Sequence, residues 1–331
     1  MDDSAHKFSF FPYSPTHAHC VTTIGNFDGC HLGHQALIRN NQELGKRLAC
    51  PNIVLTFDPH PQQYFQPETA PGELLTPERK TRALRELGVS AHYVLKFNAE
   101  LSHTECQTFY NAFLRETLKT RALTVGDDFR FGHLRKGDAR WLAERGRLDG
   151  IQVDIIPPVS FDQQAVSSTR IRKVLTETGD LSLVKNMLSH PYSLEGTLVR
   201  GEQLGRKLGF PTLNLEAPLQ IIPLDGVYCG YVWIEHLSLQ AQAPIIKVET
   251  DKLLPAVFSI GMRPTFQPEE PRLCIEAHVL EALPPGREFY KIKSAFYFEK
   301  RLRGMIAFKN SEELKQQMAK DVKIAKTSLC L

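Results

Sequence analysis

The sequence predicts an α/β protein of two domains: an N-terminal doubly wound, Rossmann-like sheet and a C-terminal antiparallel β-barrel with a terminal helix. Three observations support this fold class. The 331 residues exceed what one hydrophobic core usually carries. Short apolar runs alternate with amphipathic helical stretches up to about residue 188, which is typical of a mostly parallel sheet. Beyond that point, short β-rich runs are joined by Gly/Pro turns, and this pattern favours a barrel.

In the first half, the apolar runs predict strands, and the stretches between them predict crossover helices. The first helix carries Leu37, Leu44 and Leu48 on one face, and the second begins at Thr76 and Pro77 and ends at Gly88. Further helices are expected over 109–118, after Asp138, and as a closing pair at 168–179 and 180–188. The predicted strands are 21–25, 52–57, 92–97, 122–126 and 151–156.

In the second half, six strands and one helix are expected. The helix covers 310–326, with Asn310 or Ser311 as its N-cap and Glu312 and Glu313 in its first turn. The predicted strands are 192–199, 210–215, 226–235, 254–261, 273–280 and 292–303.

Composition excludes several classes of function. The net charge is only +3, and its Lys and Arg residues are spread along the chain, so neither a nucleic acid nor a membrane is expected as a partner. Seven scattered cysteines without a C-x-x-C pair predict reduced thiols and a cytoplasmic protein. The first twenty residues do not resemble a secretory signal, and no apolar run approaches the length needed to span a membrane.

The stretch "TIGNFDGCHLGHQALIRN", residues 23–40, is the strongest candidate for a functional site. It joins a predicted strand to a helix, where ligands bind in doubly wound sheets. Gly25 and Gly33 allow close approach of the backbone, and the free N–H groups of the helix start attract an anion. His31 and His34 are three residues apart, so they share a face of the first turn and can donate hydrogen bonds to phosphoryl oxygens.

The four residues "HLGH" resemble the H-x-G-H motif of a nucleotidyltransferase superfamily, and the longer string "GNFDGCHLGH" resembles bacterial bifunctional riboflavin kinase/FAD synthetases. The first half also carries, in order, the matching blocks "TFDPHP", "VGDDFRFG" and "VSSTRIR". The second half carries the kinase-like blocks "GRKLGFPTLNL", "DGVYCGYV", "SIGMRPTF" and "IEAHVL". The resemblance covers residues 20 to 325, nearly the whole chain.

For residues 15–188, the resemblance implies an FMN adenylyltransferase domain, in which FMN attacks the α-phosphorus of ATP to give FAD and pyrophosphate. His31 and His34 would be catalytic, and Asp128 and Phe129 would contact the ribose or the flavin, although the residue type by itself favours ordinary packing for Phe129. The residues expected to bind ATP are Gly25, Asn26, Phe27, Gly33, Ser167, Ser168, Thr169 and Arg170.

For residues 189–331, the resemblance implies a riboflavin kinase domain that makes FMN from riboflavin and ATP. Gly205, Arg206 and Gly209 would bind ATP. Thr212 and Asn214 are two apart on a predicted strand, so both side chains leave the same face and offer oxygen ligands to Mg²⁺. Glu276 would be the catalytic base that takes the proton of the riboflavin 5′-hydroxyl.

The kinase half departs from the family pattern at several positions. Arg200 replaces a common His, Leu213 an Ala, and Lys291 a Gly, while Glu281 and Ala282 replace an acidic–aromatic pair. A Lys at a glycine position would oppose a positive φ. FAD synthesis is therefore the firmer expectation. The alternative is an FMN adenylyltransferase whose barrel only binds flavin or acts as a sensor.

Other readings stay open from the sequence. The cluster of His17, His19, Cys20, Cys30, His31 and His34 could bind a metal, although its spacing fits no regular zinc site. A non-catalytic flavin or nucleotide sensor is a rival of another class. The partners expected are the small-molecule substrates, with a homo-oligomer and transient delivery of product to apo-flavoproteins as further possibilities.

Overall fold

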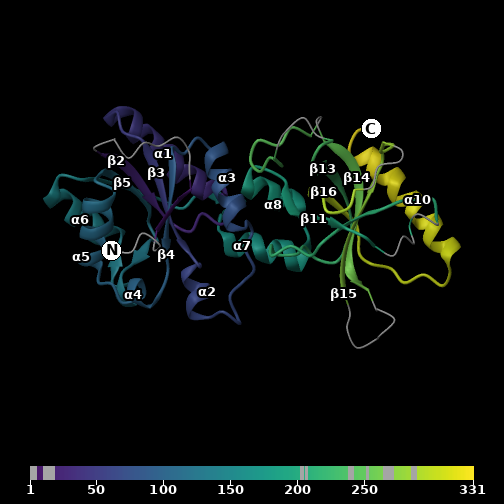
Figure 1. Cartoon of the computed structure of the whole chain (residues 1–331), viewed down its shortest axis with the longest axis horizontal. Helices are drawn as coiled ribbons and strands as arrows, with labels where there is room; N and C mark the ends of the chain where they lie inside the picture. Colours follow the sequence, from purple (N-terminus) through teal and green to yellow (C-terminus); the bar gives the residue numbers. More distant parts are fainter. Residues whose placement is uncertain are drawn as a thin grey trace. The chain divides into compact units, whose positions relative to one another are not determined.

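The computed structural model describes residues 6–9, 19–201, 205, 208–237, 242–250, 253–263, 272–284 and 289–331. The chain divides into two compact units, Met1–Ser168 and Thr169–Leu331 (Figure 1). A functional boundary between residues 188 and 189 stays a prediction. No helix in the described ranges is long and apolar enough to cross a membrane.

The first unit is built on a six-stranded sheet with the strand order β1-β4-β3-β2-β5-β8. The strands are β1 (His6–Ser9), β2 (Cys20–Ile24), β3 (Asn52–Asp58), β4 (Ala91–Lys96), β5 (Thr120–Gly126) and β8 (Gln152–Ile156). All neighbouring pairs are parallel except β1 and β4. The parallel strands therefore have the doubly wound order predicted from the alternating pattern.

Helices cover both faces of this sheet, and two core clusters show which helix lies on which face. Leu44 of the first helix packs on Val21 and Ala122, whereas Leu142 belongs to a cluster with Ile24 on the other face. The helices are α1 (Leu32–Leu48), α2 (Pro61–Phe65), α3 (Pro77–Glu86), α4 (Ala99–Ser102), α5 (Cys106–Phe109), the π-helical η2 (Tyr110–Thr117), the 3₁₀ turn η3 (His133–Arg135) and α6 (Ala139–Asp149). Two short hairpins, β6 (Arg130–Phe131) with β7 (Gly137–Asp138) and β9 (Ser160–Phe161) with β10 (Gln164–Ala165), complete the unit.

Local capping explains where these helices begin. The Thr76 hydroxyl accepts from the N–H of Arg79, and Pro77 occupies the first helical position of α3. The carboxylate of Asp138 accepts from the N–H of Trp141 at 2.8 Å and so caps α6. The single helix expected over 109–118 is α-helical only for its first residues and then becomes π-helical.

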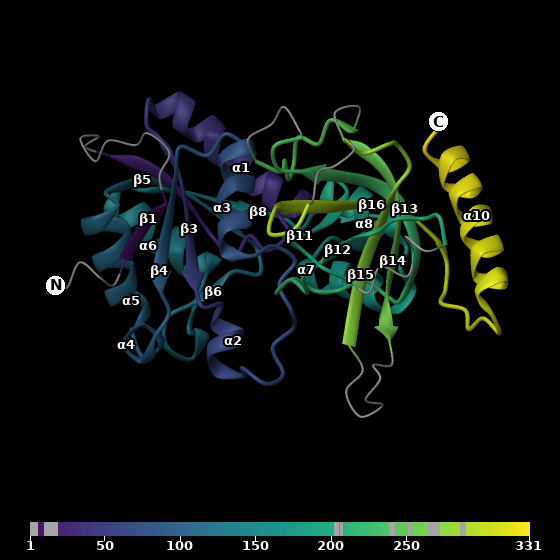
Figure 2. The ribbon, with the colours of Figure 1, turned by 45° about the vertical axis from the view of Figure 1, so that its right-hand side comes forward.

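The second unit contains a closed antiparallel barrel, as predicted, with the order β11-β12-β15-β14-β13-β16 (Figure 2). The strands are β11 (Tyr192–Val199), β12 (Leu213–Leu215), β13 (Gly226–Ile234), β14 (Leu254–Arg263), β15 (Arg272–Val279) and β16 (Lys293–Arg303). Pairing of β16 with both β11 and β13 closes the barrel. Aromatic rings of Tyr228, Phe258, Phe296 and Phe298 pack against one another in its core.

Helical segments flank the barrel on both sides in sequence. Before it come α7 (Ser168–Lys173), the π-helical η4 (Val174–Thr178) and α8 (Leu181–Leu188). After it comes α10 (Ser311–Ser328), whose N-cap Asn310 accepts from the N–H of Glu313 at 2.9 Å. Arg303 of β16 forms a two-pronged ion pair with the buried Asp321 of α10 (Nε–Oδ1 3.0 Å, Nη2–Oδ2 2.7 Å), which fixes this helix against the barrel.

Candidate active sites

The first candidate site lies at the carboxyl ends of β2 and β5. These strands are parallel neighbours, but the helices that follow them pack on opposite faces of the sheet. This is the topological switch point, where a crevice forms above a doubly wound sheet. The loop from Gly25 to His31 leads from β2 to α1, and Asp128 follows β5.

Two imidazoles stand at the start of α1, as the spacing predicted. His31 is the N-cap, and its Nδ1 accepts from the N–H of His34 at 3.4 Å. The two rings are stacked, with centroids 3.7 Å apart and planes inclined by 19°. A Cβ on Gly33 would lie 3.1 Å from Cε1 of His31, so glycine leaves the room that this ring needs. The start of α1 therefore holds both imidazole rings on the same face of the first helical turn.

Polar atoms near these rings are buried without a protein partner. Nδ1 of His34 and Oδ1 of Asn26 have no hydrogen-bond partner among the described residues. Such groups are rare in folded proteins and often mark a site that a ligand completes. Phe27 is fully buried, with its ring centroid 5.0 Å from that of His34, and its contact with a nucleotide stays a prediction.

Electrostatics keep His34 neutral. Burial is the main cause, followed by the proximity of His31 and Lys80, and together they hold the pKa of His34 well below its usual range. At pH 7 its imidazole is therefore a hydrogen-bonding group rather than a cation.

Two distant segments are tied to the histidine loop. The buried carboxylate of Asp28 accepts from the N–H groups of Leu74 and Leu75, the latter at 2.9 Å. The hydroxyl of Ser168 donates to the carbonyl of Asp28 at 2.8 Å. The "VSSTRIR" block thus meets the histidine block through Ser168, while the roles of Ser167, Thr169 and Arg170 stay predictions.

The "VGDDFRFG" block at the end of β5 contains two predicted ligand contacts, Asp128 and Phe129, which lie in different surroundings. Asp128 is exposed after the end of β5, and its contact with ribose or flavin stays a prediction. The Phe129 ring stacks on Phe131 (5.6 Å, 13°) and packs against the core, in accordance with its reading as a packing residue. Its flavin contact stays a prediction.

An aromatic cluster was missed in the sequence analysis. Tyr64 and Phe65 of α2 lie edge to face with Phe97, which follows β4, at centroid distances of 5.3 and 5.7 Å. Phe65 is 63 % exposed, and Phe57 at the end of β3 joins the cluster. The sequence signal that could have predicted this cluster is the pair of aromatic residues shortly after the "TFDPHP" block. The cluster lies beyond the carboxyl ends of β3 and β4, on the same edge of the sheet as the histidines.

A buried histidine links the sheet to α3. Nε2 of His92 lies 2.7 Å from the Thr56 hydroxyl, and Nδ1 lies 3.0 Å from the Thr81 hydroxyl. Because the Thr81 hydroxyl donates to the carbonyl of Pro77, it accepts from Nδ1–H, and Nε2 then accepts from Thr56. Burial, with a smaller effect of Lys80, lowers the pKa of His92 to about 3.

This pKa predicts a pH-dependent stability. Between pH 6.5 and 3, His92 is protonated in the unfolded chain but neutral in the folded chain. The free energy of unfolding therefore falls as the pH falls. The expected loss from His92 alone is about 2 kcal/mol on going from pH 8 to pH 5. Urea unfolding followed by Trp141 fluorescence, in a Trp233→Phe background, checks it. In that background, His92→Gln should flatten the dependence of the free energy of unfolding on pH, whereas His103→Gln, at an exposed position, should leave it unchanged. Equal pH slopes in the background protein and in both variants would contradict the prediction.

The second candidate site lies in the barrel. Asn214 on β12 is directly opposite Glu276 on β15, which is in turn opposite Ser259 on β14. Directly opposed residues share a face of the sheet, so the predicted metal ligand and the predicted base lie side by side. A Cβ on Gly201 would lie 2.4 Å from the Asn214 side chain, so this backbone passes close over it.

The glycines of the "GRKLGFPTLNL" block shape the loop before β12. The carbonyl of Gly205 accepts from the N–H groups of Leu208 and Phe210, and Gly209 has a φ of +87° that suits glycine. The strand expected over 210–215 is shorter in the structure: Thr212 is partly buried and directly precedes β12, so its sharing of a face with Asn214 stays a prediction. Arg206 lies outside the described residues.

Arg200 and Lys291, which both depart from the family pattern, lie close together beside Tyr290. The guanidinium of Arg200 lies 5.9 Å from the centre of the Tyr290 ring. The next residue, Lys291, has a φ of +60° and donates its N–H to the carbonyl of Leu198. The chain therefore keeps a left-handed turn at Lys291 although a β-carbon opposes it.

Lys291→Gly is expected to stabilise the barrel by about 0.5–1 kcal/mol, because removal of the strained Cβ outweighs the entropy of glycine. The thermal midpoint of the variant measures the effect. Lys293→Gly, an exposed position in β16, is the matched control and should lose stability. A loss of similar size in both variants would contradict the strain at Lys291.

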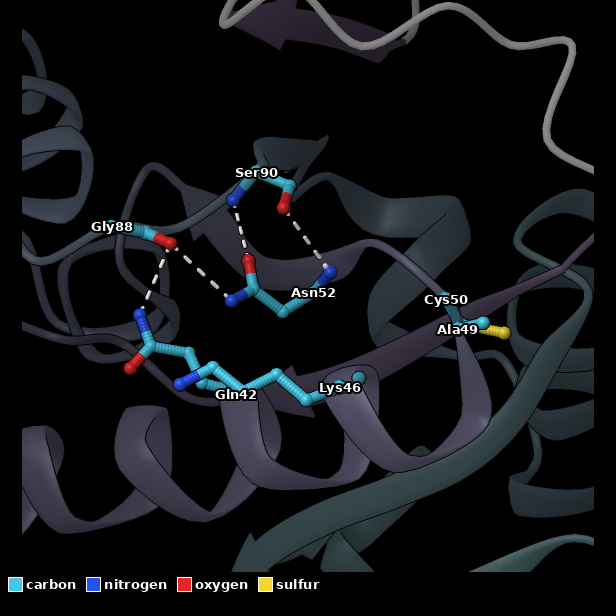
Figure 3. A pocket seen from close by; sticks show the side chains of 8 residues that line it. Gln42, Lys46, Ala49, Cys50, Asn52, Gly88 and Ser90 are labelled. Carbon is cyan, nitrogen blue, oxygen red and sulfur yellow. Dashed lines mark hydrogen bonds between the residues drawn. The ribbon is translucent and has the colours of Figure 1, made fainter.

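A hollow of 390 Å³ in the first unit is not part of either site. It lies where α1 ends and β3 begins, at the opposite end of these elements from the histidines (Figure 3). Asn52 exchanges hydrogen bonds with Ser90 and donates to the carbonyl of Gly88, as does Gln42. The polar groups of this hollow thus hold the loop before β4 in place.

Comparison with known proteins shows which family the chain is similar to. A family model described as FAD synthetase matches residues 13–170, and one described as riboflavin kinase matches residues 188–329. The bifunctional riboflavin kinase/FMN adenylyltransferases of Escherichia coli K12 and Pseudomonas fluorescens are each 34 % identical to the chain. The matches cover 91 % of this chain and 90 % of the E. coli protein, and 94 % of each chain for P. fluorescens.

A solved structure agrees over both units. A crystal structure described as a macrolide-efflux protein from Streptococcus pneumoniae superimposes with a TM-score of 0.78 at 27 % identity, over 95 % of each chain. Because two family models match most of the chain and relatives 34 % identical match at least 91 % of it, the chain belongs to the family of bifunctional riboflavin kinase/FMN adenylyltransferases.

Proposed function

We propose that the two activities of this family are carried out at the two sites described above. The chain phosphorylates riboflavin to FMN and adenylylates FMN to FAD, with ATP as co-substrate. The facing pair of Asn214 and Glu276 supports placing the first reaction in the barrel. The stacked pair of His31 and His34, with the buried Oδ1 of Asn26, supports placing the second at the switch point and is the main observation.

At the switch point, the FMN phosphate attacks the α-phosphorus of ATP, and the bond from that phosphorus to the β-phosphate oxygen breaks. Pyrophosphate leaves with the electron pair. His31 and His34 hold the phosphoryl oxygens by hydrogen bonds that strengthen as charge grows in the transition state. The N–H groups at the start of α1 add to this field. Gly25 and Gly33 leave room for the rings of Phe27 and His31.

In the barrel, the 5′-hydroxyl oxygen of riboflavin attacks the γ-phosphorus of ATP while Glu276 takes its proton. The bond from that phosphorus to the β-phosphate oxygen breaks, and ADP leaves with the electron pair. Thr212 and Asn214 would hold Mg²⁺, because a hydroxyl and an amide oxygen beside a carboxylate suit this ion. When bound, the ion neutralises charge on the ATP phosphates. Gly205 and Gly209 shape the loop expected to contact ATP.

The aromatic cluster of Tyr64, Phe65 and Phe97 supports a place for the flavin ring of FMN. It offers exposed ring faces beyond the carboxyl ends of β3 and β4. Flat aromatic ligands stack on such faces. Delivery of FAD to apo-flavoproteins, homo-oligomerisation and a cytoplasmic location are further proposals that rest on the sequence alone.

Product analysis tests the proposed function. The purified chain is incubated with riboflavin, ATP and MgCl₂, and the flavins are separated by chromatography. FMN should appear first and FAD second, and excess EDTA should suppress both. FAD formed from added FMN but not from riboflavin would favour an adenylyltransferase with a binding-only barrel. Flavin binding without either product would favour a sensor.

A further inference from the structure

His278 of β15 lies where the ladder between β12 and β15 stops (Figure 2). The last pair of this ladder is Leu213 with Ala277. Thr212, a proposed metal ligand, comes one residue before the ladder begins, and the same register continued by one residue would place it opposite His278. The ladder itself therefore holds Asn214 in place but does not reach Thr212.

The side chain of His278 contacts the segment that the ladder does not reach. Its Nδ1 lies 2.9 Å from the carbonyl oxygen of Pro211. A carbonyl oxygen only accepts, so Nδ1 carries a proton and donates it to this hydrogen bond. The same carbonyl belongs to the planar peptide group that joins Pro211 to Thr212. The hydrogen bond from His278 therefore sets the orientation of the peptide group on which Thr212 stands.

A ring contact adds to this hydrogen bond. The imidazole of His278 lies edge to face with the Phe210 ring, with centroids 5.3 Å apart and planes inclined by 71°. The N–H of Phe210 donates to the carbonyl of Gly205 at 2.8 Å and so closes the glycine loop. A Cβ on Gly205 would lie 2.4 Å from the carbonyl oxygen of Phe210 and 3.3 Å from Cγ2 of Thr212. The glycine loop and Thr212 are thus packed together, and His278 attaches them to β15.

The arrangement proposed for the barrel site needs this attachment. Glu276 and His278 are two residues apart on β15, so both side chains leave the same face of the strand. Asn214 lies opposite Glu276 in the ladder. A hydroxyl that binds the same metal ion as Asn214 has to stand at a fixed place relative to both residues, because a mobile ligand lowers the affinity for the ion.

We infer that His278 is a positioning residue of the kinase site, which donates from Nδ1 to the Pro211 carbonyl and so holds the Thr212 hydroxyl where Mg–ATP is bound. The inference rests on the proposed function, in which Thr212 and Asn214 hold the ion. His278 acts through Thr212 and is not itself assigned as a ligand.

Two substitutions separate the hydrogen bond from the ring contact. His278→Asn keeps a donor, because the donating nitrogen is bonded to Cγ in both residues, but it loses the ring. His278→Phe keeps a ring against Phe210 and loses the donor. The KM for Mg–ATP in riboflavin phosphorylation should rise about 10–100-fold in His278→Phe, as for loss of a group that orients a metal ligand, and stay within about threefold in His278→Asn. FAD formation from added FMN is the internal control and should be unchanged in both proteins.

Calorimetric titration with ADP measures binding apart from turnover. In excess MgCl₂, ADP binding at the kinase site should weaken about tenfold or more in His278→Phe and stay unchanged in His278→Asn, while binding at the histidine site is unchanged in both. With EDTA in place of MgCl₂, both variants should bind ADP like the unchanged chain, because the lost group acts through the metal ion.

Full affinity for Mg–ADP in His278→Phe, or an equal loss in both variants, would overturn the inference and leave His278 with a packing role only. Thr212→Val tests the proposed function separately, because it removes the hydroxyl and keeps the shape of the side chain. Full affinity for Mg–ADP in Thr212→Val would show that the metal site itself is placed wrongly. Weakened binding in Thr212→Val beside unchanged binding in His278→Phe would refute only the role of His278.

Discussion

His31→Ala is expected to lower the rate of FAD formation from FMN by about 10²–10³-fold. The ring of His31 caps α1, stacks on His34 at 3.7 Å and fills the space that Gly33 leaves open. Its removal takes away one of the two proposed phosphate ligands and leaves the His34 ring without its stacking partner. Chromatographic rate measurements with FMN and ATP, at saturating and limiting ATP, give the loss in kcat and in kcat/KM.

The second activity of the same protein is the internal control. Riboflavin phosphorylation by His31→Ala should stay within twofold of the unchanged chain. His103→Ala is a matched control, because His103 also belongs to a stacked imidazole pair, with His133 at 5.2 Å, but at an exposed place after α4. Loss of both activities in a folded His31→Ala protein would show that the chain does not divide its chemistry between two sites.

The fold was predictable because periodicity is a local property. Buried parallel strands such as "NIVLTF" are short apolar runs, and the interleaved amphipathic stretches can only be crossovers. The edge strand β1 escaped detection because its four residues carry no such pattern. The π-helical turns of η2 also escaped, since a one-residue widening of a helix leaves its apolar face nearly unchanged.

The first site was predictable only in its local part. His31 and His34 are three residues apart, so any helix that starts there brings them together. The N–H groups of Leu74 and Leu75 donate to the Asp28 carboxylate, and the Ser168 hydroxyl donates to the Asp28 carbonyl. These hydrogen bonds join segments 46 to 140 residues apart, and no spacing rule predicts them.

The barrel site combined a local prediction with a register that had to be observed. Alternation predicted that Thr212 and Asn214 share a face. Asn214 lies opposite Glu276 because β12 pairs with β15, and these strands are about sixty residues apart in the sequence. Lys291 shows the limit of reasoning from residue type, because the chain accepts a left-handed lysine where glycine is expected.

Glu276→Gln is expected to lower the rate of riboflavin phosphorylation by about 10²–10⁴-fold, the usual contribution of a general base. The amide keeps the shape of the side chain and its place opposite Asn214 and Ser259, but it cannot take the proton of the 5′-hydroxyl. The loss should therefore lie in kcat, while the KM for ATP changes little. Initial rates of FMN formation over a range of ATP concentrations separate the two.

A matched variant distinguishes loss of the catalytic base from damage to the barrel fold. Glu281→Gln makes the same change at an exposed position just after β15, and riboflavin phosphorylation should stay within twofold. FAD formation from added FMN should be unchanged in both variants, because that chemistry is assigned to the histidine site. If Glu276→Gln raised the KM for ATP and left kcat unchanged, Glu276 would be a nucleotide ligand, and the proton would have to leave riboflavin by another route.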